Sequence, residues 1–186
     1  MEGVLRPLLF VGLAVLVSAC GGASEPSQPG GLVFSRADGS EIDIPGRAVV
    51  WCGPWNDMIP AQALQIAAIE GVERAPGQEW FSYWRVWAII EDVRGGQPVT
   101  LPNQFIWNKP RRAEIFVGDF PTENEASSKQ EGSSGRIVFR KATCELGGEV
   151  EFTLDATIGS EFSDGDPVFG AGTFKGVVSN PPAGYY

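Results

Sequence analysis

The chain has 186 residues, of which 24 are glycine, 14 are proline and 11% are aromatic. This composition is typical of strands and turns rather than of a helical bundle, and the length suffices for one hydrophobic core without a metal or many disulfides. The net charge of −9 opposes binding to nucleic acid phosphates or anionic lipid headgroups, so no nucleic acid partner is expected.

The chain begins with an apolar segment, residues 8–17, which follows Arg6 and precedes Ser18, Ala19 and Cys20. A positive charge, then apolar residues, then small side chains is the order found in export signals. As a helix this segment would span about 15 Å, roughly half of a bilayer core, so it is too short for an ordinary membrane-spanning anchor. We therefore predict a signal helix that does not belong to the folded domain.

The residues Val17-Ser18-Ala19-Cys20 resemble the lipobox of bacterial lipoprotein precursors. This resemblance implies that residues 1–19 are a signal peptide and that Cys20 carries covalent lipid: a diacylglycerol on its sulfur and a further acyl chain, such as palmitate, on its amine. Two or more acyl chains hold a protein firmly on a bilayer. The implied location is the cell envelope, with the lipid bilayer as partner.

Gly21 and Gly22 follow the cysteine, with no aspartate after it. In a bacterium with two membranes this resembles the signal for the outer membrane, which would place the domain in the periplasm or on the surface. Residues 20–31 comprise the lipidated cysteine and a Gly-, Ser- and Pro-rich tether, with a reach of about 20 Å. Residues 32–186 are expected to form a single domain.

The mature domain has two cysteines, Cys52 and Cys144. An exported protein folds in an oxidising compartment, so an even number of cysteines favours one disulfide. Closing such a long loop would stabilise the fold by about 4–5 kcal/mol in the chain-entropy model. Two buried free thiols are the alternative. A cysteine nucleophile is disfavoured because the chain has no histidine to act as its base.

The domain reads as short strands separated by turns, and a ten-residue alternation of apolar and polar residues at 149–158 is the clearest strand. Residues 61–69 fit a strand better than a helix, although Ala and Gln there allow either. Residues 122–135 are polar and are expected to form a mobile exposed loop. The other strands are expected at 31–34, 47–52 (stopping at Gly53-Pro54), 80–93, 99–101, 105–107, 113–117, 137–144, 168–169 and 173–178.

Eight or so short strands with frequent turns and no repeating helix predict an all-β fold. An antiparallel β-sandwich is the expected architecture and a jelly roll its main variant. The domain lies behind the signal helix and the flexible tether. This pattern is loosely similar to that of uncharacterised β-sandwich lipoproteins, a similarity that implies no activity.

The absence of histidine excludes the Ser-His-Asp triad, Cys-His pairs and imidazole zinc sites. Residues 170–176 come within one position of a dinucleotide-binding fingerprint, but no βαβ context surrounds them. The chain is therefore not expected to be an enzyme, and no cofactor is expected besides the lipid on Cys20. Paired carboxylates, as in glycoside hydrolysis, are the remaining catalytic alternative.

Aromatic residues crowd one segment, with Trp80, Tyr83, Trp84 and Trp87 as its largest members. On a strand, Trp80 and Trp84 share one face, while Tyr83 and Trp87 share the other. If one face lies open to solvent, these rings would form an aromatic platform for a glycan or an envelope protein. The alternative is that both faces are packed within the protein.

Acidic residues gather in two loops, and oxygen-rich loops are the usual ligands of calcium. Glu161, Asp164 and Asp166 surround a glycine turn, and Asp119, Glu123 and Glu125 lie in another loop. Neither group has the EF-hand spacing, so ordinary turns are favoured over a metal site. We therefore expect a membrane-anchored envelope lipoprotein whose β-domain is non-catalytic and serves in binding or as a structural element. A carbohydrate-binding module is the leading specific form.

Overall fold

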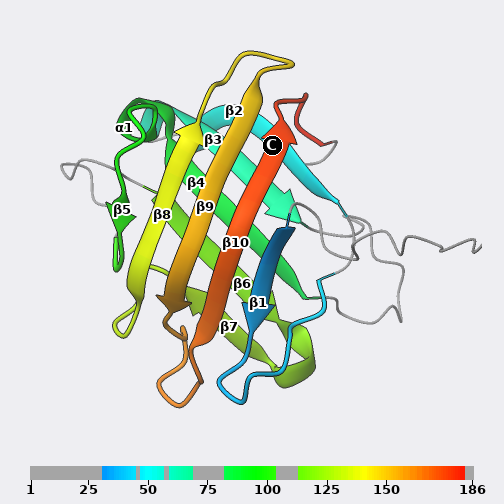
Figure 1. Ribbon diagram of the computed structural model, residues 1–186, viewed down its shortest axis with the longest axis vertical. Coiled ribbons are helices and arrows are strands. Elements are labelled where there is room, and N and C mark those ends of the chain that lie inside the picture. Colours follow the sequence, from blue (N-terminus) through cyan, green and yellow to red (C-terminus); the bar gives the residue numbers. More distant parts are fainter. Residues whose placement is uncertain (1–30, 45–46, 57–58, 69–81, 104–112, 183–186) are drawn as a thin grey trace, which may run out of the picture.

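The computed structural model describes residues 31–44, 47–56, 59–68, 82–103 and 113–182. These residues form two antiparallel five-stranded sheets packed face to face, so the prediction of an all-β sandwich is confirmed (Figure 1). The front sheet of Figure 1 has the strand order β1-β10-β9-β8-β5, and the rear sheet has the order β2-β3-β4-β6-β7.

Ten strands and two short helical turns are present in the described ranges. The front sheet comprises β1 (Leu32–Ser35), β5 (Val99–Thr100), β8 (Ser134–Lys141), β9 (Glu149–Ile158) and β10 (Val168–Val177). The rear sheet comprises β2 (Ala48–Asn56), β3 (Ile59–Ala68), β4 (Tyr83–Ile89), β6 (Ala113–Asp119) and β7 (Asn124–Ser127). The helical turns are α1 (Ile90–Val93) and η2 (Phe120–Thr122). Within these ranges no helix has the length and apolarity needed to cross a membrane.

The core lies between the two sheets and is rich in aromatic rings. Trp84 of β4 is 1% exposed, and its ring centroid lies 5.6 Å from that of Phe174, 6.2 Å from that of Phe34 and 6.5 Å from that of Phe152. Phe152 belongs to β9, where the expected alternation of buried and solvent-facing side chains is present along the whole strand. The inward residues of both sheets therefore form one continuous core.

The topology is built mainly from hairpins between consecutive strands. β8, β9 and β10 pair in sequence in the front sheet, and β2, β3 and β4 pair in sequence in the rear sheet. Each sheet therefore contains a three-stranded meander, while β1 with β10, β8 with β5 and β4 with β6 pair without being consecutive. A jelly roll consists instead of two Greek keys. The sandwich is therefore confirmed without the jelly-roll variant.

Three of the four sheet edges make hydrogen bonds to other backbone, and the fourth is very short. Ile42 donates its backbone N–H to Phe34 on β1, Ser179 donates to Val50 on β2, and Ser127 on β7 donates to Gly159. β5 has only two residues. Backbone of the same chain therefore occupies some of the groups at these edges, which shortens the pairing template that an open edge offers.

The prediction of a mobile exposed loop at 122–135 is wrong. This segment contains β7, which pairs with β6, and Ser127, Ser128 and Ser133 are at most 5% exposed. Polar residues can be buried here because their hydroxyl groups have backbone partners. Ser128 Oγ accepts the N–H of Ile115 at 3.0 Å, and Ser133 Oγ accepts the N–H of Gly159 at 2.8 Å.

Several strand boundaries also differ from the sequence prediction: the strand expected at 80–93 ends at Ile89 and is followed by the helical turn α1 at Ile90–Val93, and the strand expected at 137–144 ends at Lys141. β2 continues past Gly53 and Pro54 to Asn56, which is compatible with proline because β2 is an edge strand. β10 is one continuous strand instead of two short ones, since its glycines make room for rings: a Cβ at Gly170 would lie 2.9 Å from Phe34. The strand predicted at 61–69 is confirmed up to Ala68, where β3 ends. Ile69 and the strand predicted at 105–107 lie outside the described residues.

The disulfide between Cys52 and Cys144 is present, with a Cα–Cα distance of 5.5 Å. Cys52 lies on β2 of the rear sheet, and Cys144 follows β8 of the front sheet. The bond therefore joins the two sheets covalently at the end opposite β7, near the hairpin between β8 and β9 (Figure 1).

Candidate functional site

The structure divides the predicted aromatic platform between two faces of β4. Trp84 points into the core and is 1% exposed, so this ring is not available to a ligand. Tyr83 and Trp87 lie half-buried on the outer face of the rear sheet. Trp80 lies outside the described residues.

The outer face of the rear sheet carries a row of rings around a cation. The Tyr83 ring stacks on Phe116 at 5.7 Å and lies 5.5 Å from Phe120. The Arg85 guanidinium lies 5.2 Å from the centroid of Tyr83 and 6.0 Å from that of Trp87. Because these rings are half-buried and pack against one another, they contribute to the stability of the sheet before any ligand is considered.

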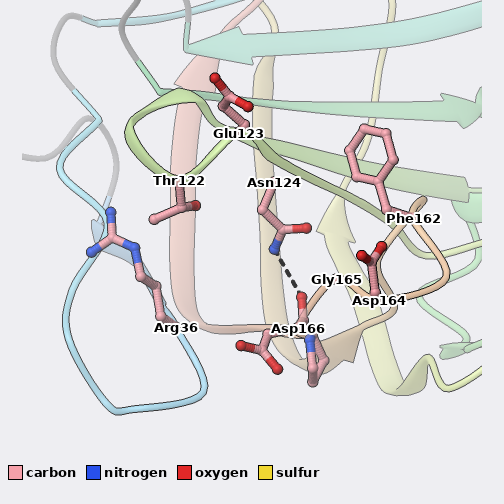
Figure 2. Close-up of a pocket in the computed structure, with 9 residues that line it drawn as sticks. Arg36, Thr122, Glu123, Asn124, Phe162, Asp164, Gly165 and Asp166 are labelled. Atoms are coloured by element: carbon pink, nitrogen blue, oxygen red, sulfur yellow. Dashed lines mark hydrogen bonds between the residues drawn. The ribbon is translucent and has the colours of Figure 1, made fainter.

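A pocket of about 370 Å³ opens at the end of the sandwich opposite the disulfide. Figure 2 shows side chains from three separate segments around it. We call it the loop-end pocket, and its lining residues are Arg36, Thr122, Glu123, Asn124, Phe162, Asp164, Gly165, Asp166 and Pro167. Arg36 follows β1, the second group spans η2 to β7, and the third group lies in the loop between β9 and β10.

Asn124 fixes the β9–β10 loop to the rest of the pocket. Its side-chain N–H donates to the backbone C=O of Asp166 at 2.8 Å, the bond drawn dashed in Figure 2. The hydroxyl of Ser160 donates to the amide oxygen of Asn124 at 3.0 Å and accepts the N–H of Phe162, also at 3.0 Å. At Gly165 a Cβ would lie 2.9 Å from that amide oxygen, so the close approach of this loop requires glycine. The loop is therefore held in place without a ligand.

Glu123 is the non-glycine residue with positive φ in the described ranges, at φ 55° and ψ 25°. This left-handed conformation is unfavourable for a residue with a side chain and persists only where the surrounding structure imposes it. Here it ends η2, where the Glu123 N–H donates to the C=O of Phe120. The sharp reversal brings Glu123 and Asn124 to the pocket side by side.

The chemistry of the loop-end pocket is polar, with one aromatic ring at its rim. Glu123, Asp164 and Asp166 supply carboxylates, and Thr122 supplies a hydroxyl group. Phe162 is 49% exposed. Arg36 is the basic residue among the described lining residues, but its guanidinium donates hydrogen bonds to protein acceptors. The pocket therefore has an excess of negative charge together with many hydrogen-bond acceptors.

The calcium candidates are separated by the fold. Asp164 and Asp166 line the loop-end pocket, whereas Glu161 lies 3.0 Å from the ammonium group of Lys129. Glu123 joins the two aspartates at the pocket, Asp119 is buried, and Glu125 uses its backbone C=O to accept the N–H of Glu161. Across the described ranges, no three acidic or cysteine side chains gather in a group that could hold a metal ion.

A second carboxylate arrangement lies away from the pocket lining. Glu114 is 6% exposed, accepts the hydroxyl of Ser127 at 2.8 Å and lies 3.8 Å from the Lys129 ammonium group. Burial raises the pKa of Glu114, while Ser127 and Lys129 partly offset that rise. Hydrogen bonding to Glu161 raises the pKa of Lys129. Lys129 thus stands between two carboxylates, Glu114 and Glu161.

Besides Gly165 and Pro167, four lining residues of the pocket were not among the sequence candidates: Arg36, Thr122, Asn124 and Phe162. Arg36 stands directly after β1, and the other three stand next to turns, positions at which functional residues are frequent. No spacing in the sequence connects residue 36 with residues 122–124 and 162–167. Comparison with protein-family models, with curated proteins and with solved structures finds no match to this chain.

Proposed function

We propose that this chain is a cell-envelope lipoprotein, anchored by lipid on Cys20, whose β-sandwich is a non-catalytic domain that binds an uncharged saccharide in the loop-end pocket. The observation that carries the binding proposal is the pocket itself: three segments distant in sequence meet around about 370 Å³, within the size range of small-ligand sites. Anchoring rests on the sequence Val17-Ser18-Ala19-Cys20.

The lining chemistry favours a polyhydroxylated, uncharged ligand. Carboxylates accept hydrogen bonds from hydroxyl groups, as do the side-chain oxygens of Thr122 and Asn124. An exposed ring such as Phe162 offers an apolar surface on which one face of a sugar can pack. Anionic ligands are disfavoured, because three carboxylates line the pocket and the charge of Arg36 is paired with Asp119.

The disulfide supports the envelope location. Structural disulfides persist in oxidising compartments such as the periplasm and the cell surface. The Cys52–Cys144 bond joins the two sheets of the domain, so it is part of the folded structure. An exported domain is what a signal peptide before Cys20 would deliver.

The arrangement of Glu114, Lys129 and Glu161 argues against carboxylate-dependent hydrolysis at that pair of glutamates. A glycoside hydrolase holds the scissile bond, or the attacking water, between its two carboxyl groups. Here the ammonium group of Lys129 occupies that position, at 3.8 Å from Glu114 and 3.0 Å from Glu161. The carboxylates of the loop-end pocket come instead from Glu123, Asp164 and Asp166.

A glycan array probed with the full chain, expressed with its lipid and purified in detergent, tests the binding proposal. We expect binding to uncharged glycans that is lost in Phe162→Ala. Phe169→Ala is the matched control, since Phe169 is also an exposed ring, 41% against 49%, but lies on the outer face of the front sheet. A blank array would overturn the proposal in favour of a structural role, and equal loss in both variants would place the ligand elsewhere.

A further inference from the structure

Asp119, the last residue of β6, is a buried carboxylate behind two walls of the loop-end pocket. Its side chain is 1% exposed. Arg36 Nε donates to Asp119 Oδ2 at 2.5 Å, and Arg36 Nη2 donates to Oδ1 at 2.9 Å. The hydroxyl of Thr122 donates to Oδ2 at 2.8 Å, and that of Ser82 donates to Oδ1 at 3.1 Å.

These four bonds fill the acceptor capacity of the carboxylate, which has about four lone-pair sites. They also connect four segments of the chain. These are the residue after β1, the last residue of η2, the residue before β4 and the last residue of β6. Arg36 and Thr122 line the pocket, while Asp119 and Ser82 stand behind them. One buried group therefore holds side chains from both sheets.

Arg36 is oriented almost entirely by protein acceptors. Besides the two bonds to Asp119, its Nη1 donates to the hydroxyl of Ser40 at 3.1 Å and to the backbone C=O of Glu41 at 3.2 Å. The loop that carries Ser40 and Glu41 is thereby fixed to β6 through the planar guanidinium group. Bidentate pairing of this kind restricts the geometry more than a single hydrogen bond does.

We propose that Asp119 is the positioning residue of the loop-end pocket, the group that holds the Arg36 and Thr122 walls in their binding-competent arrangement. The inference rests on the proposed function for its effect on ligand affinity, but the positioning itself is a property of the free protein. A pocket whose walls are already in place loses less conformational entropy on binding, so its affinity is higher.

The electrostatics of Asp119 are consistent with this role. Burial acts to raise the pKa of Asp119, but the hydrogen bonds from Arg36, Thr122 and Ser82 and the charge of Arg36 outweigh it, so the pKa is lower than usual. Asp119 therefore stays ionised, the form in which it accepts all four bonds, throughout the neutral range. The walls are held without any change in protonation.

Hydrogen–deuterium exchange of full-length Asp119→Asn tests the positioning without a ligand. The amide of Gly39, bonded to Arg36, and that of Glu123, bonded to Phe120, should exchange about tenfold faster or more, since local opening then costs less. The amide of Gly165, in the wall fixed by Asn124, should be unaffected. Unchanged protection at Gly39 and Glu123, or equal loss at Gly165, would overturn the inference.

Glu114→Gln is the matched control. Glu114 is also a buried carboxylate on the same strand as Asp119, but its side-chain partners Ser127 and Lys129 do not line the pocket. We expect this variant to leave exchange at Gly39 and Glu123 unchanged. Faster exchange there would show that any buried carboxylate on β6 has this effect and would contradict a special role for Asp119.

Two further measurements complete the test. If Asp119→Asn does not fold, Thr122→Val removes one of the four bonds, and faster exchange at Glu123 alone is then the supporting result. For an uncharged glycan found on the array, Asp119→Asn should weaken binding by roughly tenfold while Glu114→Gln does not. A blank array would refute the proposed function yet leave the exchange result standing. Equal affinity in both variants would refute the positioning role.

Discussion

Cys52 on β2 is bonded to Cys144, which follows β8, so each of the two sheets is covalently tied to the other. The two residues are separated by 92 positions in the sequence. β2 and β8 make their backbone pairs in different sheets, so this tie adds a connection that the hydrogen-bond ladders do not provide.

Loss of this disulfide should destabilise the domain. The double variant Cys52→Ala, Cys144→Ala should lower the free energy of unfolding by about 3–5 kcal/mol, because the unfolded chain gains the entropy of a long open loop. Chemical denaturation of the oxidised wild type and of the variant measures the difference. Thiol counting on the unfolded, unreduced mature protein should find no free thiol, and two free thiols would contradict the bond.

Membrane attachment should depend on Cys20. Changing Cys20→Ser removes the sulfur to which the lipid would be attached, so the protein should leave the membrane fraction and appear in the aqueous phase on detergent partitioning. Cys144→Ser is a useful control, because it removes a cysteine without touching the proposed anchor. Retention of the Cys20→Ser protein in the membrane fraction would refute the anchoring proposal.

The side chains on the inner and outer faces of β4 should contribute differently to the stability of the domain. Trp84→Ala removes a fully buried ring among three phenylalanines and should cost about 3–5 kcal/mol of unfolding free energy. Trp87→Ala removes a half-buried ring on the outer face and should cost about 1 kcal/mol. Denaturant titration measures both, and similar losses for the two variants would contradict the assignment of faces.

Stability should depend on the ionisation of Glu114. Its pKa is raised above the ordinary value of 4.5 by burial, so the protonated form stabilises the fold fully below 4.5, and this contribution is lost as pH rises through the folded pKa. At pH 7 the carboxylate is ionised, and the cost of burying its charge lowers the free energy of unfolding. Glu114→Gln should therefore match or exceed the wild type in stability at pH 7 by up to about 1 kcal/mol.

Denaturation of wild type and Glu114→Gln at pH 4.5 and pH 7 checks this sign. The wild type should lose stability relative to the variant as pH rises between these values. A variant that is clearly less stable at pH 7 would show instead that the attraction between Glu114 and Lys129, 3.8 Å apart, outweighs the cost of burial.

Much of the fold could be predicted from the sequence, because apolar alternation is a direct consequence of a half-buried strand. Residues 149–158 became β9 with the expected face buried. The prediction of an exposed loop at 122–135 is wrong, because serines of this segment are buried and accept hydrogen bonds from backbone N–H groups on β6 and just after β9. Hydrogen bonds between elements distant in sequence leave no local pattern, so composition alone assigned this segment to solvent.

The candidate site was harder to predict, for a related reason. The predicted aspartates at 164 and 166 do line the pocket, but their neighbours there are Arg36 and Asn124 instead of Glu161. Arg36 and Asp119 are 83 residues apart and meet only because β1 and β6 end at the same end of the sandwich (Figure 1). Topology decides which loops meet, and a single sequence carries no direct record of it.

The hydrogen bonds at the sheet edges would have a consequence if the domain is held on a membrane through Cys20, as proposed. Copies confined to two dimensions encounter one another far more often than copies free in solution. An open strand would then add to its neighbour and seed an intermolecular sheet. The backbone bonds of residues 42, 127 and 179 occupy some of the edge groups through which that growth would begin. Fewer groups would then be available for pairing between anchored copies.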